Sequence, residues 1–264
     1  MRLTSIIIPT YNGLPLLQRC VAAIRQYTHV PYEIIVVDNA STDGTSSYCV
    51  QENLRSVRLP VNRGFPAACN LGLRLAEGDE LLLLNNDVTV TPCWLMNLRS
   101  ALHSAADIGI VGPVTNYVSG LQQVDCGANS MEQFMSYAVR NNVSDAVRWR
   151  EVKRLVGFCM LFSRKLLDRI GYLDEGYGAG HYEDDDFCFR ARLQGSRLLM
   201  CSDCFVHHEG SASFAKVRQP ELEALIERNY RRFMSKWHTD PREYIELPEN
   251  TVRGEPYESG GGGT

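Results

Sequence analysis

Short apolar runs alternate with longer amphipathic stretches over the first 115 residues. The runs are rich in Ile, Val and Leu, end at polar or turn-forming residues, and lie at 3–8, 33–37, 57–59 and 81–84. Such runs are typical of strands buried on both faces of a sheet. Stretches with helical spacing lie at 14–27, 45–52 and 66–76. This alternation predicts an α/β domain with a Rossmann-like, mainly parallel central sheet flanked by helices.

The pattern is less regular beyond Val90. Apolar runs predict strands over 88–90, 108–114, 155–163 and 197–200. Helical spacing predicts helices over 92–103, 164–170, 183–193 and 219–237. Residues 116–150 are polar and show no clear periodicity, and residues 171–180 are expected to form a glycine-rich loop.

Polar residues stand where two of the predicted strands end. Asp38 follows the second strand, and Asn85, Asn86 and Asp87 follow the run at 81–84. Taken alone, the second segment fits an ordinary Asx turn. In open α/β sheets, however, ligands bind outside the carboxyl ends of the strands. We therefore expect Asp38 and Asp87 to face one cleft, where a carboxylate can hold a divalent cation that neutralises a diphosphate.

Four acids in succession, Glu183 to Asp186, open a predicted helix. Acids in a first turn interact favourably with the helix dipole, and Asp is a good N-cap, so two of them need no further explanation. Four neighbouring carboxylates repel one another, which should raise the pKa of at least one. A carboxylate with a raised pKa beside a glycine-rich loop is a candidate general base, and we weigh this role evenly against a helix cap.

Two adjacent histidines, His207 and His208, follow the predicted strand at 197–200. Successive side chains of a strand point to opposite faces, so the two cannot both face the core. One of them is a candidate ligand for a metal or a phosphate.

Composition narrows the class of protein. The 264 residues carry a net charge of −4, which argues against a mainly electrostatic nucleic-acid binder. The sequence shows neither an 18-residue apolar run nor a charged start followed by an apolar segment, so we expect a cytoplasmic location. Nine scattered cysteines fit reduced, buried thiols, and Cys201 and Cys204 lack the spaced partners of a zinc site. P-loop, dinucleotide-binding and nucleophile-elbow motifs are absent.

Ordered motifs run through residues 3 to 213. They are SIIIPTYNG at 5–13, IIVVDNASTDGT at 34–45, NRGF at 62–65, NLG at 70–72, LNND at 84–87, EDDD at 183–186 with Arg190, and HHEG at 207–210. In this order they resemble the family 2 glycosyltransferases of the GT-A fold, and the LNND and EDDD motifs resemble a rhamnosyltransferase-like subgroup. The resemblance implies one domain over 1–240, with a nucleotide-binding half at 1–115 and an acceptor-binding half at 116–240, and a tail or linker at 241–264.

The resemblance also implies roles for individual residues. The nucleotide would be contacted by Pro9, Thr10, Tyr11, Asp38, Arg63 and Asn86. Asp87 would bind a Mn²⁺ or Mg²⁺ ion that bridges the diphosphate, with His207 as a further ligand and His208 as the fallback. Asp184 would be the general base. Supporting contacts to the donor or acceptor fall to Asn85, Glu183, Asp186 and His208.

We therefore expect an inverting, metal-dependent glycosyltransferase that moves a sugar from a nucleotide-diphosphate sugar, UDP- or dTDP-linked by preference. The acceptor would be a hydroxyl of a glycan, a lipid-linked glycan or a protein, in the synthesis of cell-surface polysaccharide or glycoconjugate. A non-catalytic nucleotide-sugar-binding module and a protein-modifying glycosyltransferase are the alternatives. A nucleotidyltransferase is disfavoured because the first loop, Thr10 to Gly13, lacks a lysine.

The predicted last helix carries Arg228, Arg231 and Arg232 near Phe233 and Trp237. A solvated basic face is favoured over peripheral docking on an anionic membrane at the inner face.

Overall fold

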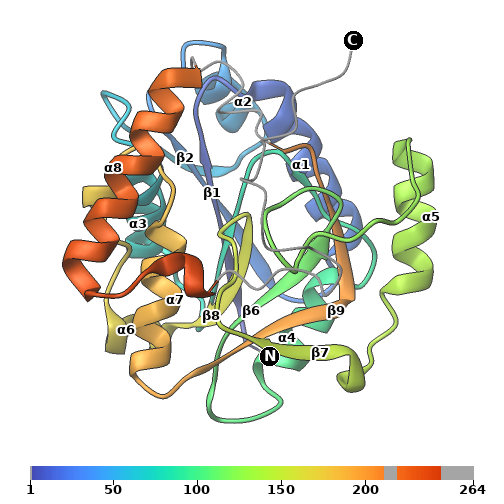
Figure 1. Ribbon diagram of the computed structural model, residues 1–264. Coiled ribbons are helices and arrows are strands. Elements are labelled where there is room, and N and C mark those ends of the chain that lie inside the picture. The colour runs from blue at the N-terminus through green and yellow to red at the C-terminus, as the bar shows by residue number, and fades with distance from the viewer. Residues whose placement is uncertain (1, 211–218, 245–264) are drawn as a thin grey trace.

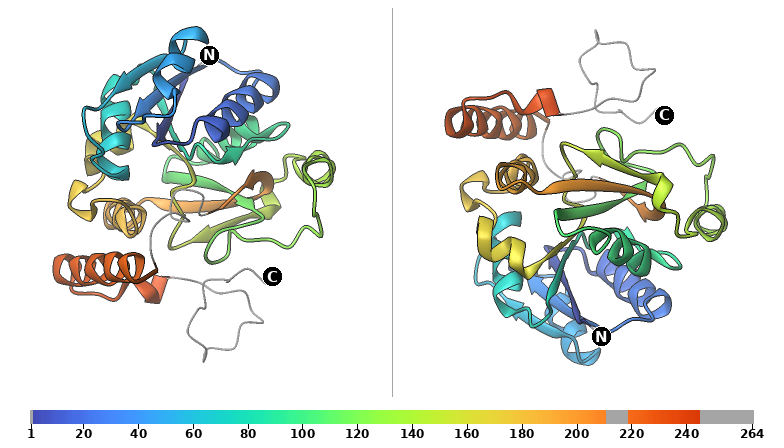
Figure 2. Two further views of the ribbon diagram at one scale, coloured as in Figure 1. Left: turned by 90° about the horizontal axis from the view of Figure 1, so that it is seen from above. Right: turned by 90° about the horizontal axis from the view of Figure 1, so that it is seen from below.

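The computed structural model describes residues 2–210 and 219–244, which form one mixed sheet between two layers of helices (Figures 1 and 2). The strands are β1 Thr4–Thr10, β2 Tyr32–Asp38, β3 Arg55–Arg58, β4 Glu80–Leu84, β5 Val88–Thr89, β6 Ile108–Thr115, β7 Trp149–Val152, β8 Cys159–Ser163 and β9 Arg197–His208. The α-helices are α1 Leu14–Tyr27, α2 Thr45–Gln51, α3 Phe65–Leu75, α4 Trp94–Leu102, α5 Met131–Asn141, α6 Arg164–Ile170, α7 Glu183–Leu193 and α8 Gln219–Trp237. Short 3₁₀ turns occur at Ala146–Arg148, Glu175–Tyr177 and Pro241–Tyr244. The α/β fold predicted from the sequence is confirmed.

The first four paired strands form the parallel part that the sequence predicts. β1 pairs in parallel with β2 on one side and with β4 on the other, and β2 pairs in parallel with β3. Each crossover contains a helix, as a parallel connection requires. In α1, Pro15 stands in the first turn, where its missing N–H costs no helical hydrogen bond, and Leu17, Val21 and Ile24 are buried against the sheet.

The second part of the sheet corrects the expectation of a mainly parallel arrangement. The described strands follow the order β3-β2-β1-β4-β8-β6-β9-β5, with β7 on β9. β8 runs antiparallel to both β4 and β6, and β9 runs antiparallel to β5 and β7 but parallel to β6. The sheet is therefore mixed. An apolar run has the same composition in either direction, so hydrophobicity predicted the strand β8 without its orientation.

Strand β9 is three times as long as the predicted strand at 197–200. The polar pair Ser202 and Asp203 interrupts its apolar sequence, and the register with β6 shifts there from Cys201 to Phe205. A bulge of this kind accommodates extra residues and bends the strand. Asp203 is fully buried at the bulge, where its carboxylate accepts hydrogen bonds from the Trp149 indole and from the Asp145 N–H, each at 2.9 Å.

The polar stretch 116–150 contains structure that hydrophobic periodicity did not reveal. α5 packs on β9 through Phe134 and Tyr137, whose rings contact Phe205. The Ser130 hydroxyl caps this helix by accepting the N–H of Gln133 at 3.3 Å, and the Gln133 side chain accepts the N–H of Asn129 at 2.7 Å. The S-x-x-Q spacing of a capping box is the sequence signal that would have found α5.

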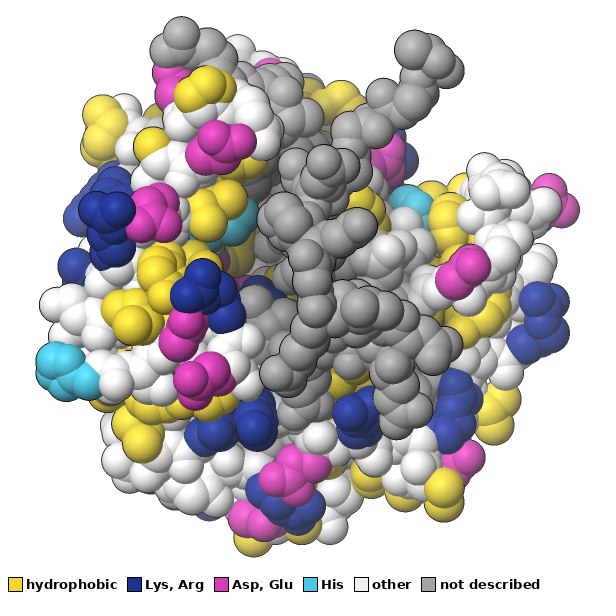
Figure 3. All heavy atoms as spheres, viewed as in Figure 1, with side chains coloured by type: hydrophobic (Ala, Val, Ile, Leu, Met, Phe, Trp, Pro, Cys, Tyr) yellow, Lys and Arg dark blue, Asp and Glu magenta, His cyan; other side chains and the backbone are white. Residues whose placement is uncertain are grey.

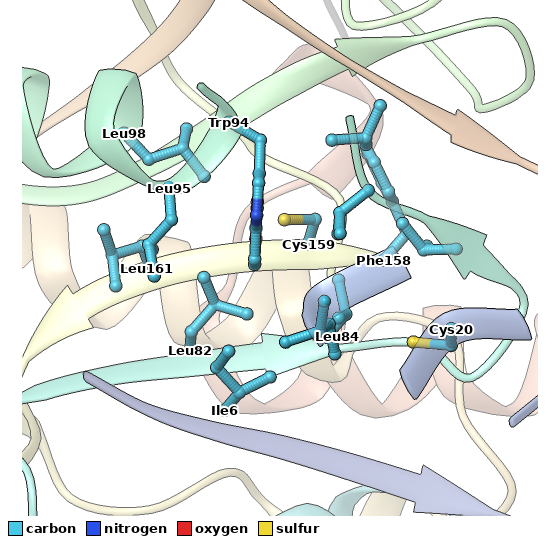
Figure 4. Packing of buried hydrophobic residues seen from close by; sticks show 14 of the residues in the cluster. Ile6, Cys20, Leu82, Leu84, Trp94, Leu95, Leu98, Phe158, Cys159 and Leu161 are labelled. Atoms are coloured by element: carbon cyan, nitrogen blue, oxygen red, sulfur yellow. The ribbon is translucent and has the colours of Figure 1, made fainter. Parts of the chain in front are cut away.

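Apolar residues fill both faces of the sheet. Trp94 and Leu98 of α4 and Cys20 of α1 pack with Leu82, Leu84 and Phe158 on one face (Figure 4). A second cluster beneath α3, α6 and α7 covers the other face. All nine cysteines are free and seven are buried, as expected for reduced thiols. Cys201 and Cys204 lie near the backbone carbonyls of Leu199 and Trp94.

α8 lies outside α7 (Figure 2). Lys and Arg side chains are interspersed with Asp and Glu over its outer surface (Figure 3). The 3₁₀ turn after α8 places Tyr244 against Phe189, with ring centroids 5.6 Å apart, so residues 241–244 of the expected tail pack on the domain. The remainder of that tail lies outside the described residues. Within 2–210 and 219–244, no helix has the length and apolar character to cross a membrane.

Candidate functional site

Three neighbouring strands end side by side around Thr10. In the β1–β2 register, Thr10 stands opposite Asp38. On its other side, the Thr10 hydroxyl accepts a hydrogen bond from Asn86 Nδ2 at 2.8 Å. Pro9, Thr10, Asp38 and Asn86 are buried, whereas the Tyr11 side chain is half exposed. The polar residues predicted at the carboxyl ends of β1, β2 and β4 therefore share one edge of the sheet, as expected.

The Asp38 carboxylate organises the loop that follows β2. It accepts the Ser41 N–H at 2.7 Å and the Ser46 hydroxyl at 2.6 Å, and the Arg58 guanidinium lies 3.8 Å away. The next residue, Asn39, accepts the N–H of Arg63 at 2.8 Å. The Arg63 side chain is largely exposed and lies 3.4 Å from Glu175. Hydrogen bonds thus join the loop after β2 to the loop that carries Arg63, next to the strand ends that hold the other predicted nucleotide-contacting residues.

Asp87 and His208 face each other across the β5–β9 pair. Nε2 of His208 lies 3.2 Å from Oδ1 of Asp87, and both side chains are more than 90% buried. Nδ1 of His208 lies 2.8 Å from the carbonyl oxygen of Tyr117. Because a carbonyl can only accept, Nδ1 donates to it, and Nε2 is the ring nitrogen that faces Asp87. This spacing suits a cation shared by the two atoms, whether a proton on Nε2 or a metal ion.

The neighbouring His207 has different surroundings. Its ring packs on Phe134 with centroids 4.5 Å apart, and its buried Nδ1 has no hydrogen-bond partner. Burial lowers the pKa of His207 below its ordinary value. Asn85 lies at the other side of Asp87, donates its backbone N–H to the Phe158 carbonyl at 2.9 Å, and has a buried side-chain oxygen without a partner. The geometry therefore favours His208 over His207 as the candidate metal ligand that lies beside Asp87.

The first turn of α7 carries Asp184 on a fixed backbone. Its Oδ2 accepts the Gly157 N–H at 2.9 Å, and its Oδ1 accepts the Asp185 N–H at 2.9 Å. Each carboxylate oxygen can accept a second hydrogen bond. These two bonds set the orientation of the carboxylate and leave it able to accept a proton.

The other acids of the cluster differ in their partners. Burial, and then the charge of Asp184, raises the pKa of Glu183 well above its usual range, and Oε2 of Glu183 is buried without a partner. Burial also raises the pKa of Asp185 to about 7, although Arg154, 2.7 Å away, opposes that shift. Raised pKa values in this cluster match the expectation from the sequence. Desolvation rather than mutual repulsion is their largest cause.

Asp186 is fully buried and serves as an anchor. It pairs with Arg190 at 2.8 Å and with Lys236 at 2.6 Å, and it accepts the Trp237 indole N–H at 2.8 Å. Through Asp186, α7 is tied to the last helix. Phe233 is buried, and the guanidinium of Arg232 bonds to Asp174, so side chains that suggested membrane docking make contacts within the fold.

The dipeptide Gly157–Phe158 links the acidic cluster to Asp87. Gly157 donates to Asp184, while the Phe158 ring stacks on His208 with centroids 5.2 Å apart. Of the preceding residues, Leu155 is buried and Val156 is half-buried, but their N–H groups bond to side chains rather than to a strand: Leu155 to Cys188 and Val156 to Gln122. This is why β8 begins at Cys159 and not at Leu155 as predicted. Sequence reasoning missed Gly157 and Phe158 as site residues because their burial resembles that of a strand.

The donor set at Asp87 fits a hard divalent cation. Mg²⁺ is typically bound by one or two carboxylates together with substrate phosphates, and its octahedral geometry places adjacent ligands about 3 Å apart. A metal-bound imidazole usually donates its second N–H to a carbonyl or a carboxylate, as His208 does to Tyr117. No group of three or more His, Cys, Asp or Glu placed to hold a metal occurs in the part of the chain that the structure describes. Two protein ligands with further ligands from a diphosphate match this arrangement.

Comparison with known proteins gives a consistent assignment. The model of glycosyl transferase family 2 matches residues 5–171. The hyaluronan synthase of Pasteurella multocida is 29% identical over 238 residues, which cover 78% of this chain and 24% of the synthase. The chain spans 24–56% of the length of the first curated relatives that it matches.

Solved structures share the fold. A mannosyltransferase from Pyrobaculum calidifontis, solved with GDP-Man and Mn²⁺, superimposes with a TM-score of 0.65 at 21% identity, covering 92% of this chain and 66% of that one. GalNAc-T7, solved with UDP, GalNAc and Mn²⁺, gives a TM-score of 0.68 at 18% identity, covering 92% and 50%. The GT-A fold predicted from the motifs is thereby confirmed. The strand-end residues and the family match lead to one conclusion: the chain belongs to glycosyl transferase family 2.

Proposed function

We propose that the chain is an inverting, metal-dependent glycosyltransferase that moves a sugar from a nucleotide-diphosphate sugar to an acceptor hydroxyl. The observation that carries the proposal is the buried pair of Asp87 Oδ1 and His208 Nε2, 3.2 Å apart, at the edge where β1, β2 and β4 end. A carboxylate oxygen and an imidazole nitrogen at this spacing can both ligate one divalent cation, and the polar residues at the ligand-binding edge beside them suit a diphosphate that such a cation would hold.

Each residue has a task in this proposal. Pro9, Thr10, Tyr11, Asp38 and Asn86 hold the base and ribose, and Arg63 lies beside the nucleotide. Asp87 and His208 hold Mn²⁺ or Mg²⁺, with His207 as the second candidate and Asn85 contributing polar contacts. When bound, the metal offsets negative charge on the diphosphate.

Asp184 is the proposed general base. Its carboxylate takes the proton from the acceptor hydroxyl as that oxygen bonds to the anomeric carbon, while the bond from that carbon to the diphosphate oxygen breaks on the opposite face. The electron pair leaves with the nucleoside diphosphate, and the configuration inverts. The fixed orientation of Asp184 supports this role because proton transfer requires a base within hydrogen-bond reach. Glu183 supports the donor or acceptor from the same turn, and Asp186 holds the first turn of α7.

Relatives support a nucleotide-sugar donor and a glycan acceptor. The solved neighbours were obtained with GDP-Man and with UDP and GalNAc, in both cases with Mn²⁺, and a hyaluronan synthase matches in sequence. These names support the proposed role in the synthesis of a cell-surface polysaccharide or glycoconjugate. UDP or dTDP donors, the rhamnosyltransferase-like subgroup, the single domain over 1–240 with its nucleotide and acceptor halves, the cytoplasmic location and peripheral membrane contact stay predictions from the sequence.

Release of nucleoside diphosphate tests the proposal. UDP-, GDP- and dTDP-sugars are first screened by thermal shift with Mn²⁺, since a bound ligand stabilises the folded state. Turnover of the stabilising donor is then measured with and without EDTA, in the wild type and in Asp87→Ala and Asp184→Asn. We expect turnover to require the metal and both carboxylates. Full activity in EDTA would exclude the metal role, and unchanged transfer by Asp184→Asn would exclude the base.

A non-catalytic nucleotide-sugar-binding module is the second candidate, because the acidic first turn of α7 also suits a helix cap. Such a module would show a thermal shift with the donor but release no nucleoside diphosphate. A protein-modifying transferase would differ in its acceptor. With a labelled donor sugar, the label would be recovered on protein rather than on glycan.

A further inference from the structure

Buried Asn229 of α8 bonds to the loop that leads into the acidic cluster. Its amide donates to the carbonyls of Tyr177 at 2.8 Å, Gly180 at 2.7 Å and His181 at 3.0 Å, and the residue is fully buried. An amide nitrogen has two hydrogens, so its whole donor capacity is used on this one segment. Arg228 donates to Asn229 Oδ1 at 3.0 Å and to the Tyr177 carbonyl at 3.1 Å. The orientation of the amide is therefore fixed.

The segment that Asn229 holds has an unfavourable backbone conformation. His181 and Tyr182 have φ angles of +69° and +71°. Residues with a Cβ rarely occupy this left-handed region, and two in succession persist only where the surroundings hold them. Tyr182 is the N-cap residue of α7, immediately before Glu183 and Asp184. The direction in which the first turn of α7 presents Asp184 depends on these two backbone angles.

The same loop is held at its other end by α3. Asn70 is buried, accepts the Leu173 N–H at 3.0 Å, and donates to the Leu173 carbonyl at 2.9 Å and to Glu175 at 3.0 Å. Residues 173–182 thus run between two buried asparagines. Asn70 lies within residues 5–171, the part that the family model matches, whereas Asn229 lies beyond it.

We propose that Asn229 is a positioning residue for sugar transfer. By holding the Gly180 and His181 carbonyls, it fixes the strained turn and so aims Asp184 at the acceptor hydroxyl. The inference rests on the proposed function, in which Asp184 is the base. It makes α8 part of the catalytic unit, although α8 touches neither Asp87 nor the nucleotide-binding loops in any described contact.

The test uses Asn229→Asp, which keeps the shape of the side chain but loses both N–H donors, and Asn229→Ser, which keeps one donor. Two variants on the same helix serve as controls. Phe233→Leu weakens the packing of buried Phe233 on Phe189, 5.7 Å away between ring centroids, without touching the loop. Arg231→Ala removes an exposed pair with Glu227. Donor hydrolysis is measured with Mn²⁺ and the nucleotide sugar chosen by thermal shift, well below each variant's unfolding temperature.

We expect Asn229→Asp to lower kcat by about 10- to 100-fold, the cost of a misplaced catalytic group, with the donor KM and the pH midpoint of kcat unchanged. Asn229→Ser should fall between this variant and the wild type, and both controls should keep the wild-type kcat. If Asn229→Asp had the wild-type kcat, or if Phe233→Leu lost as much kcat as Asn229→Asp, the positioning role of Asn229 would be overturned. The proposed sugar transfer would stand in either case. Absence of turnover in the wild type and Arg231→Ala would overturn the proposed function together with this inference.

Discussion

The backbone N–H of Gly157 donates to Oδ2 of Asp184 at 2.9 Å, and this bond joins the two chemical parts of the site. The next residue along the chain, Phe158, stacks on His208 and accepts the N–H of Asn85 through its carbonyl. The proposed base Asp184 on α7 and the proposed metal-binding pair, Asp87 just before β5 and His208 on β9, thus rest on one dipeptide. Movement of this segment would displace both groups together.

Asp184→Asn should abolish base catalysis without unfolding the protein. The amide keeps the size of the carboxylate, and its oxygen can still accept the Gly157 N–H. Loss of a general base typically costs about 10²- to 10⁴-fold in rate, so kcat for nucleoside diphosphate release should fall by that factor with the donor KM unchanged. Steady-state kinetics and a urea denaturation curve check both parts. A fall in stability that accounts for the whole loss of activity would contradict the assignment.

A pair of matched variants distinguishes which of the two histidines binds the metal. His208→Ala removes the imidazole beside Asp87, whereas His207→Ala removes one that packs on Phe134. We expect His208→Ala to weaken Mn²⁺ binding in the presence of UDP or GDP by at least about 10-fold, since even outer-shell partners of metal ligands contribute 10- to 100-fold. His207→Ala should have a smaller effect. Calorimetric titration with Mn²⁺ measures both, and the reverse order would restore His207 as the ligand.

The sequence could not show which of the two histidines lies beside Asp87, and the reason is physical. Strict alternation along a strand would assign each histidine to a face by counting residues. The bulge at 202–204 breaks this count, because it inserts residues that have no partner on β6. Only the folded register shows that His208 is the one that faces Asp87.

Other parts of the site followed directly from local sequence. The apolar run of β4 put Asn85, Asn86 and Asp87 at the carboxyl end of a strand, where Asn86 is found to bond to Thr10, and the acidic start of α7 was located to the residue. The partners that hold these residues come from distant segments: Gly157 for Asp184 and Asn229 for the loop before it. Such contacts depend on tertiary packing, and neither periodicity nor turn chemistry encodes them.

Asp174 should contribute to stability in a defined range of acid pH. Partial burial acts to raise its pKa, but hydrogen bonds from Lys236, from the Gly176 N–H and from Arg232 outweigh burial and lower it to about 2. The unfolded value is about 3.9, so the unfolded state binds more protons between these values and stability falls as pH drops from about 4 to about 2. Urea unfolding across this range should show a shallower loss for Asp174→Asn than for the wild type. Identical slopes would show that Asp174 is not linked to folding.

The buried contacts of Asp186 should contribute more to the free energy of unfolding than any exposed ion pair on the last helix. Asp186→Ala leaves Arg190 and Lys236 without their shared carboxylate, and breaking a buried pair costs about 3–5 kcal/mol. Glu227→Ala breaks a pair with Arg231 that is more than half exposed on both sides, and such pairs contribute less than about 1 kcal/mol. The free energy of unfolding from urea titrations checks the contrast. Similar losses in the two variants would show that Asp186 is not the anchor of α8.

Gly64 and Gly195 differ in how closely a second loop packs against them. Both have positive φ angles, +85° and +77°, but a Cβ on Gly64 would lie 1.9 Å from the Gly178 carbonyl oxygen, whereas one on Gly195 meets nothing within 4 Å. Gly195→Ala should therefore cost about 1–2 kcal/mol from strain alone. Gly64→Ala should cost roughly 1–3 kcal/mol more, because its ψ of 173° puts the backbone in a region essentially restricted to glycine and because the loop at 174–182 must move. That loop precedes Asp184, so Gly64→Ala should also lower kcat while Gly195→Ala does not. Equal unfolding free energies would show that the two loops can separate freely and that their contact does not position the acidic cluster.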